Sequence, residues 1–283
     1  METIVWKLPV NSSEATIFSP PTGIAAFLSL DHASKFLPGG AYTTFRSFHH
    51  NRVLRLHDHF NRLSETSNLS GKKVKLDVER IKTELRKMLE GYQANEVRIR
   101  ITVDLENEPS TTYLSIEELI LPSQADYENG VKVVSKSMHR ENPKAKLSKF
   151  LETAATIRQT VPRGINEVVM LDQNGNFLEG LSSNFFVVIG KTLWTADEGV
   201  LSGLTRKMVL EGAIQIGMNI QLEGFSASRI QKIDEVFITS TSRSILPVTQ
   251  IDQISISNGL PGEWTRKLTA WFVDEIEKQI EPI

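Results

Sequence analysis

The chain contains no cysteine among its 283 residues. This absence excludes disulfide bonds, thiolate metal sites and catalytic thiols, and it suits a reducing cytoplasm, where we expect the protein to reside. A net charge of only −2 at pH 7 gives no electrostatic reason to expect nucleic acid or an anionic membrane as a partner. No apolar run approaches the ~18 residues of a membrane-spanning helix, and the acidic start METIVWKLPV differs from a secretory signal.

Two enzyme classes with recognisable motifs find little support. The G-x-S-x-G motif of many serine hydrolases is absent. A metal hydrolase would have to use the paired histidines of the first third of the chain, which lack a carboxylate at metal-ligand spacing: His49, His50, His57 and His59. We therefore expect no metal site. A binding module without enzymatic activity stays open, because it needs none of these motifs.

The first part of the chain alternates strand and helix patterns. Residues 41–48 and 96–103 show the period of two that is typical of strands. Asp77 is placed to cap a helix with an apolar stripe at Ile81, Leu85 and Met88. Proline, glycine and asparagine interrupt the pattern in LPSQADYENG, residues 121–130.

The second part is richer in strands. Residues 131–138 predict a strand, and EVVMLDQNGNFLEG predicts a hairpin with an Asn-Gly turn. A helix is expected from about Ser148, with Phe150, Leu151, Ala154, Ile157 and Val161 facing inward. The sequence thus predicts an α+β protein, with a smaller N-terminal α/β domain (1–121), a linker (122–130) and a larger strand-rich C-terminal domain (131–283).

Glu179 is a carboxylate in an apolar setting. Phe177, Leu178 and Leu181 surround it in the stretch NFLEGLSSNFFVV. Because burial disfavours an ionised carboxylate, Glu179 needs a positively charged partner.

Three turns in the second part carry small polar residues between apolar segments: 182–184, 203–205 and 239–242. The turn Gly203-Leu204-Thr205 opens a helix, so its free backbone N–H groups and a hydroxyl could receive a phosphate. Arg62 could add a bidentate contact to the same phosphate. Helix caps and a solvated arginine are the more common explanations of these residues when each is taken alone.

Three lysines follow one another in NPKAKLSKF, namely Lys144, Lys146 and Lys149. Such a group is often a solvated face, but lysine is also the side chain that condenses with an aldehyde. A lysine, a phosphate seat and a carboxylate for a ring nitrogen are together the parts that pyridoxal 5′-phosphate needs. Glu179 would then face the protonated pyridine nitrogen.

The order of these segments resembles a known family, the class IV (fold-type IV) pyridoxal-phosphate-dependent aminotransferases. This group includes branched-chain and D-amino-acid aminotransferases, (R)-amine transaminases and aminodeoxychorismate lyases. The similar segments run from about Tyr42 to Lys267, and they are GAYTTFRSF, HDHFNRL, GINEVVMLDQNGNFLEGLSSNFF, LSGLTRKMV, DEVFITSTS…LPV and GEWTRKL.

The resemblance implies roles for particular residues. Lys146, eighteen positions before Gly164, would be the catalytic lysine, with Lys144 and Lys149 as the alternatives. Glu179 would bind the pyridine nitrogen and Leu201 would pack on the ring. The implied phosphate contacts are Arg62, Leu204, Thr205, Ser240 and Thr241. The family's pocket is built from two subunits, so we expect a homodimer. Residues 20–30 and HDHFNRL are expected to contribute apolar residues to its interface.

The resemblance also implies where substrate binds. Tyr42, Thr44 and Arg46 share the strand face that would look at the substrate, and Arg243 is a second carboxylate partner. The implied reaction moves an amino group between an amino acid or amine and a 2-keto acid, through an internal aldimine on the lysine.

Three departures keep the specificity open. Leu151 stands where branched-chain enzymes carry tyrosine, Thr241-Ser242-Arg243 replaces their Thr-Ala-Ala, and Val103 stands where D-amino-acid enzymes carry arginine. The alternative reaction is that of an aminodeoxychorismate lyase, which releases pyruvate to give 4-aminobenzoate and in which Thr44 would relay a proton.

Overall fold

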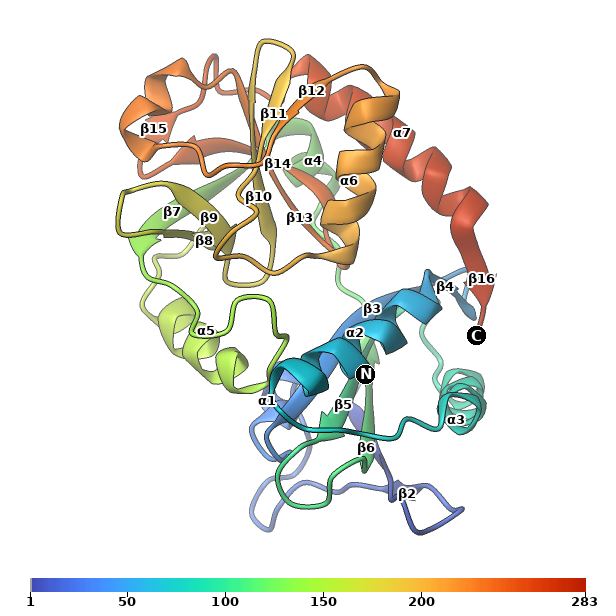
Figure 1. Ribbon diagram of the computed structural model, residues 1–283. Coiled ribbons are helices and arrows are strands. Elements are labelled where there is room, and N and C mark those ends of the chain that lie inside the picture. Colours follow the sequence, from blue (N-terminus) through green and yellow to red (C-terminus); the bar gives the residue numbers. More distant parts are fainter. Residues whose placement is uncertain (1) are drawn as a thin grey trace. The chain divides into compact units, whose positions relative to one another are not determined.

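The computed structural model describes residues 2–283 and divides the chain into two compact units. The first unit takes the chain up to Ile120, together with Ala145–Ala155 and Gln279–Ile283. The second unit takes Leu121–Lys144 and Thr156–Lys278. Two short segments therefore belong to the first unit although they follow the predicted linker in sequence. Helices and strands occur in both units, so the predicted α+β class is confirmed (Figure 1).

The first unit is built on a seven-stranded antiparallel sheet in the order β16-β4-β3-β5-β6-β1-β2. The predicted strands at 41–48 and 96–103 are confirmed as β3 and β5. The strands are β1 (Ile4–Leu8), β2 (Thr16–Ile17), β3 (Gly40–Phe48), β4 (Arg52–Leu54), β5 (Val97–Asp104), β6 (Thr112–Glu118) and β16 (Ile280–Pro282).

The two faces of this sheet differ in character because side chains alternate along each strand. One face carries Phe45, Ile101 and Leu114 into a core with α2 (Leu56–Leu69) and α3 (Val78–Gly91). Asp77 caps α3 as predicted, by accepting a 3.1 Å hydrogen bond from the Arg80 amide.

The other face is polar. The register of β3 and β5 places Tyr42 opposite Thr102, Thr44 opposite Arg100 and Arg46 opposite Arg98. The short helix α1 (Leu30–Ser34) lies against this face, because the Arg100 guanidinium donates to its first carbonyl and to its Ser34 hydroxyl. The predicted side-chain alternation thus separates a hydrophobic core from a polar face on which Tyr42, Arg46 and Arg100 are themselves buried.

The second unit is built on a nine-stranded sheet in the order β12-β11-β10-β13-β14-β7-β8-β9, with β15 added to β14. Strand β9 also pairs with β10, through Glu179 and Asn184, so the pairing closes on itself at the predicted site. The strands are β7 (Val131–Ser137), β8 (Ile165–Leu171), β9 (Phe177–Gly180), β10 (Asn184–Ile189), β11 (Thr192–Trp194), β12 (Asn219–Gln221), β13 (Glu235–Ser240), β14 (Ser244–Ile251) and β15 (Ile254–Ser255).

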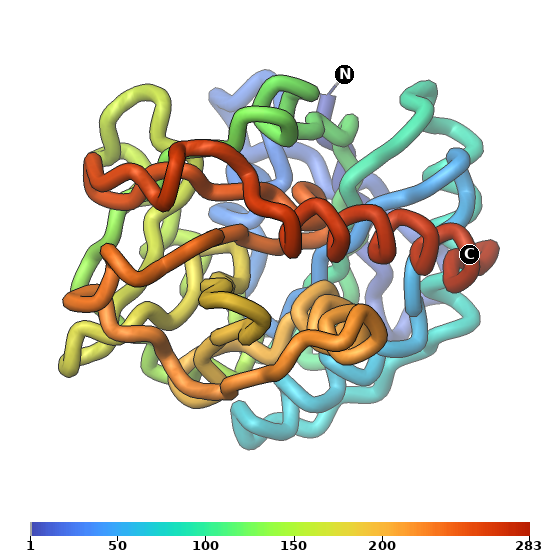
Figure 2. Tube along the Cα trace, turned by 90° about the horizontal axis from the view of Figure 1, so that it is seen from above, coloured from blue at the N-terminus to red at the C-terminus, as the bar shows by residue number. Residues whose placement is uncertain are grey.

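Two long helices accompany this sheet, α6 (Leu204–Gln215) and α7 (Glu263–Gln279). They lie side by side in Figure 2, in orange and red. Gly212 of α6 makes this approach possible, because a Cβ atom there would collide with the Trp271 ring of α7. A short 3₁₀ helix (Ala227–Lys232) completes the unit.

The structure adds detail to two local predictions. The predicted linker contains a short helix, because Ser123 and Asp126 form a capping box that starts α4 (Gln124–Asn129). Helix α5 (Lys149–Gln159) has one fully buried residue, Ala154, whereas Phe150, Leu151 and Ile157 are only half-buried. The residues of the predicted inward stripe are thus among the less exposed ones of α5, and its exposed residues lie outside the stripe.

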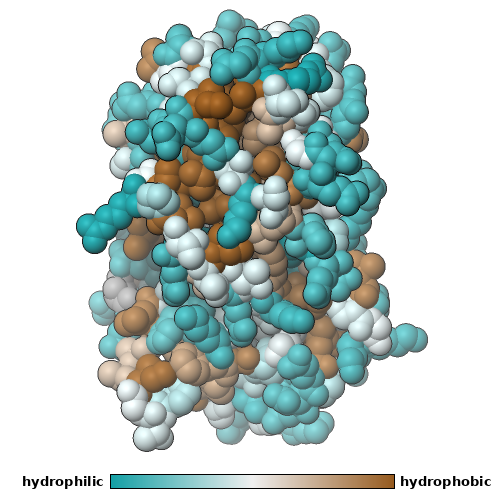
Figure 3. All heavy atoms as spheres, turned by 90° about the vertical axis from the view of Figure 1, so that its left-hand side faces the viewer, coloured by the Kyte–Doolittle hydropathy of each residue, from teal (hydrophilic) through white to brown (hydrophobic). Residues whose placement is uncertain are grey.

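No helix within residues 2–283 is long and apolar enough to cross a membrane. Hydrophobic residues nevertheless reach the surface among hydrophilic ones, as the brown areas of Figure 3 show for one face.

Candidate active site

The backbone of Lys146 is fixed within the first unit. The Tyr42 amide donates a 2.9 Å hydrogen bond to the Lys146 carbonyl, and the Ser148 amide donates one of 2.9 Å to the Gly40 carbonyl. The Lys146 amide in turn donates to the Thr66 hydroxyl of α2 at 3.2 Å. The segment that carries the lysines is thus attached to both β3 and α2.

The three candidate lysines differ in their surroundings. The Lys146 Nζ atom lies 4.7 Å from the centre of the Tyr42 ring, in a cation–π contact. Lys144 is 52% exposed and forms an ion pair of 3.3 Å with Glu198, and Lys149 is exposed. Among the three, Lys146 alone is half-buried.

The pKa of His59 depends on the charges around Lys146. Its Nδ1 atom lies 2.7 Å from the Thr43 hydroxyl, and the ring is buried. Burial, together with the positive charges of Arg62 and Lys146, lowers the pKa of His59 to about 3. His59 is therefore neutral at pH 7, and the two cations predicted to bind cofactor both act on it. No group of three metal-binding side chains occurs within the described chain, 2–283.

The predicted substrate residues of β3 have protein partners. The Thr44 hydroxyl accepts a 3.2 Å hydrogen bond from Arg100 Nε, and the Arg100 guanidinium lies 5.2 Å from the Tyr42 ring. Arg46 forms an ion pair with Glu96 and stacks on Phe48 at 4.5 Å. Sequence reasoning missed Arg100, although its place on a period-two strand would have put it on the same sheet face as Thr44.

Glu179 is the centre of the cluster in the second unit. Its Oε1 atom accepts a 3.0 Å hydrogen bond from Arg140 Nη1. Its Oε2 atom accepts from the Asn184 side-chain amide at 3.2 Å and from the Leu201 backbone amide at 3.1 Å. The residue is 3% exposed, so these donors replace water around its carboxylate. The sequence predicted a positively charged partner for Glu179 but did not identify Arg140 as that partner.

The start of α6 adjoins this cluster. Gly203 is the N-cap residue and provides no side-chain cap, so the first amides of the helix remain available. A Cβ atom at Gly203 would collide with the Asn184 side chain, which also donates to the Leu201 carbonyl at 2.9 Å. The predicted residues Leu204 and Thr205 are half-buried at this helix start.

The turn between β13 and β14 holds the remaining predicted residues. Ser240, Thr241 and Arg243 are half-buried there. The neighbouring Thr239 hydroxyl is buried and has no hydrogen-bond partner among residues 2–283. Arg243 donates to Glu167 Oε2 at 2.8 Å, so it too has a carboxylate partner in the protein.

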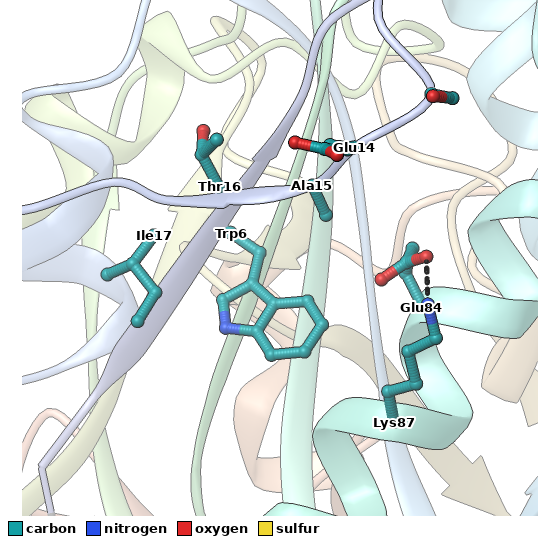
Figure 4. Close-up of a pocket in the computed structure, with 8 residues that line it drawn as sticks. Trp6, Glu14, Ala15, Thr16, Ile17, Glu84 and Lys87 are labelled. Atoms are coloured by element: carbon teal, nitrogen blue, oxygen red, sulfur yellow. Dashed lines mark hydrogen bonds and ion pairs between the residues drawn. The ribbon is translucent and has the colours of Figure 1, made fainter.

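The candidate residues thus form two clusters, one in each unit. A separate hollow of about 330 Å³ in the first unit contains none of them (Figure 4). It is lined by Trp6, residues 13–17 and the ion pair between Glu84 and Lys87. The candidate site therefore does not coincide with this hollow.

Known proteins resemble the chain over much of its length. The family model for class IV aminotransferases matches residues 40–251. A D-alanine aminotransferase of Listeria monocytogenes is 35% identical over 109 residues, which cover 38% of this chain and 38% of that protein. The chain spans about half or less of the length of the curated relatives that it first matches.

Solved structures share the fold. The branched-chain amino acid aminotransferase of Escherichia coli superposes with a TM-score of 0.76 at 20% identity, over 99% of this chain and 97% of that one. A fold IV transaminase of Curtobacterium pusillum gives a TM-score of 0.74 at 16% identity, over 96% and 99% of the two chains. The fold is therefore that of fold-type IV aminotransferases. Since the family model covers most of the sequence, the chain belongs to the class IV aminotransferase family.

Proposed function

We propose that the protein is a pyridoxal-phosphate-dependent aminotransferase that moves an amino group between an amino acid or amine and a 2-keto acid. The observation that carries this proposal is the buried Glu179 carboxylate, which accepts hydrogen bonds from Arg140, Asn184 and the Leu201 amide. An ionised carboxylate is the partner that holds a pyridine nitrogen in its protonated form.

The residues of the second unit also fit the phosphate of such a cofactor. The uncapped start of α6 offers backbone N–H groups at Leu204 and Thr205. The Thr239 hydroxyl is buried and has no hydrogen-bond partner in the described part of the chain, and Ser240 and Thr241 follow it. An anion bound here would accept hydrogen bonds from the first amides of α6 and from the Thr239 hydroxyl. Arg62, in the first unit, would add a guanidinium.

When bound, pyridoxal phosphate supplies an aldehyde that bonds to a lysine amine and a ring that takes up the electron pair released at the substrate's α-carbon. Lys146 Nζ, steadied by the Tyr42 ring, would be the amine and later the base that receives the α-proton. The neutral His59 supports this role, because it adds no positive charge beside the ammonium group.

The partners in this proposal are a small amino donor and a keto acid, and the active form is a homodimer. Arg46 and Arg243 remain the proposed carboxylate contacts. Both already pair with acidic residues, so a substrate carboxylate would have to share or displace Glu96 or Glu167.

The test is a panel of amino donors, each incubated with the protein and pyridoxal phosphate, followed by 2-oxoglutarate or pyruvate. We expect amino transfer with at least one donor, and none with Lys146→Ala. Aminodeoxychorismate is assayed separately. Pyruvate release from that compound without amino transfer in the panel would overturn the proposal in favour of a lyase.

A further inference from the structure

Glu167 is a fully buried carboxylate that none of the proposed roles uses. It lies on β8 and is 3% exposed. Its Oε2 atom accepts hydrogen bonds from the Ser182 hydroxyl at 2.8 Å, the Ser183 hydroxyl at 3.1 Å and the Ser182 amide at 3.2 Å. Arg243 Nη1 donates to the same oxygen at 2.8 Å. Four donors therefore converge on one carboxylate oxygen.

These donors come from two different turns. Ser182 and Ser183 belong to the turn between β9 and β10, which begins after Glu179 and Gly180 and leads to Asn184. Arg243 belongs to the turn between β13 and β14, where Ser240 and Thr241 stand. Glu167 is thus a bridge between the turn beside the proposed pyridine contact and the turn that carries proposed phosphate contacts.

The bridge is tightly built. A Cβ atom at Gly180 would lie 2.7 Å from Glu167 Cγ and would collide with the Ser183 hydroxyl, so the turn can close only over a glycine. Arg243 Nη2 also donates to the Ser182 hydroxyl at 3.3 Å, which joins the two turns directly. The bridge therefore has little freedom to let the turns move apart.

Glu167 remains ionised in this position. Burial by itself raises its pKa, but the charges of Arg243 and Arg158 and the hydrogen bonds from Arg243 and Ser182 outweigh burial and lower it. The contact with Arg243 is therefore a charge-assisted hydrogen bond at neutral pH, which is stronger than one between neutral groups.

We propose that Glu167 is a positioning residue that, through Ser182 and Arg243, sets the spacing between the turn after Glu179 and the turn with Ser240 and Thr241. This inference rests on the proposed function, because the spacing matters only if one rigid ligand binds both turns. Such a ligand gains affinity at its second contact only when the two contacts are held at the matching distance.

The gain can be measured with two probes, pyridoxal 5′-phosphate and pyridoxal, which lacks the phosphate. The dissociation constant of pyridoxal divided by that of pyridoxal 5′-phosphate measures how much the phosphate contributes to binding. Each constant is obtained by equilibrium titration followed by absorbance. For Glu167→Gln we expect this ratio to fall by about tenfold, since the charge-assisted link to Arg243 is lost while the shape of the side chain is kept.

Two further variants test whether the effect passes through the bridge. Arg243→Gln breaks the same link from its other end, at a side chain that is 20% exposed, and should lower the ratio similarly. The double variant should be no worse than either single one, as expected for residues that act as a unit. If Glu167→Gln fails to fold, Arg243→Gln by itself still tests the proposal.

Glu235→Gln is the matched control. Glu235 is also a buried carboxylate of the second unit, and it accepts bonds from the Trp264 amide at 3.0 Å and from the Thr265 amide and hydroxyl at 2.7 Å. It holds the start of α7 and touches neither turn. Its loss should lower the melting temperature and leave the ratio of dissociation constants unchanged.

The outcomes separate this inference from the function on which it rests. If the unaltered protein binds neither probe, the proposed function fails. If it binds pyridoxal phosphate far better than pyridoxal and both bridge variants keep that ratio, the positioning role of Glu167 is overturned. An equal weakening of both probes would likewise assign Glu167 to general stability.

Discussion

Arg140 Nη1 donates a 3.0 Å hydrogen bond to Glu179 Oε1, and the two side chains are 8% and 4% exposed. Arg140 is therefore the positively charged partner that the sequence predicts for Glu179, because a carboxylate surrounded by apolar residues needs a cation. Removing one partner of a buried pair leaves an uncompensated charge, which costs more than the intact pair contributes.

Arg140→Leu should therefore lower the free energy of unfolding by about 3 kcal/mol. Chemical denaturation at pH 7 measures this change. The double variant Arg140→Leu/Glu179→Leu should recover much of the loss, since no unpaired charge remains. Lys144→Leu is the control, because its exposed pair with Glu198 should contribute less than about 1 kcal/mol. An Arg140 effect as small as that of Lys144 would contradict the account.

Glu179→Gln should retain the fold and still bind cofactor, but it should lose most of its activity. A neutral amide cannot keep the ring nitrogen protonated, so we expect kcat to fall by about 100-fold or more. Glu198→Gln, at an exposed carboxylate, should leave kcat unchanged. Near-normal turnover in Glu179→Gln would remove this residue from the mechanism.

His59 should make stability depend on pH between about 6.5 and 3. Its pKa in the folded protein, about 3, lies below its ordinary value of 6.5, so the unfolded chain binds a proton that the folded chain excludes. Stability therefore falls as the pH decreases, by about 2 kcal/mol at pH 5. Protonation of Glu167 and Asp172 affects stability only at lower pH, because their pKa values in the folded protein lie below their ordinary values of 4.5 and 3.8.

The comparison is between the unaltered protein and His59→Gln, each unfolded in urea at pH 7 and pH 5. The variant should lose less stability on acidification than the unaltered protein. Equal losses in the two proteins would mean that His59 titrates normally.

The predicted homodimer can be tested by a substitution in the predicted interface segments of the first unit. Phe60 and Leu63 of HDHFNRL are buried in that unit's own core, so they are not free to face a second subunit. Leu28, by contrast, is 84% exposed within the predicted interface segment 20–30. Sedimentation should show a dimer that Leu28→Asp weakens. Val273→Asp, at a 53% exposed position on α7, should not weaken it. A monomer with full activity would contradict the prediction.

Local patterns predicted the local structure well. The alternation in AYTTFRSF and EVRIRITV placed β3 and β5, because each strand has one hydrophobic face and one more polar face, although both faces are largely buried. Asp77 marked the start of α3 through the chemistry of its side chain. The likeness of several motifs in order was enough to predict the family and the fold.

The partners of the charged residues could not be predicted in the same way. Arg140 lies 39 positions before Glu179, and Glu167 lies 76 before Arg243, so no local period connects them. Their pairing depends on how the strands of the second unit close on one another.

The central claim is that Lys146 bonds to pyridoxal phosphate. The direct measurement is incubation of the protein with pyridoxal phosphate, reduction with borohydride, and peptide mass analysis. We predict one pyridoxyl modification, on Lys146, which should be absent from Lys146→Ala and retained in Lys149→Ala and Lys144→Ala. A modification on Lys144 or Lys149 in the unaltered protein, or none at all, would contradict the account.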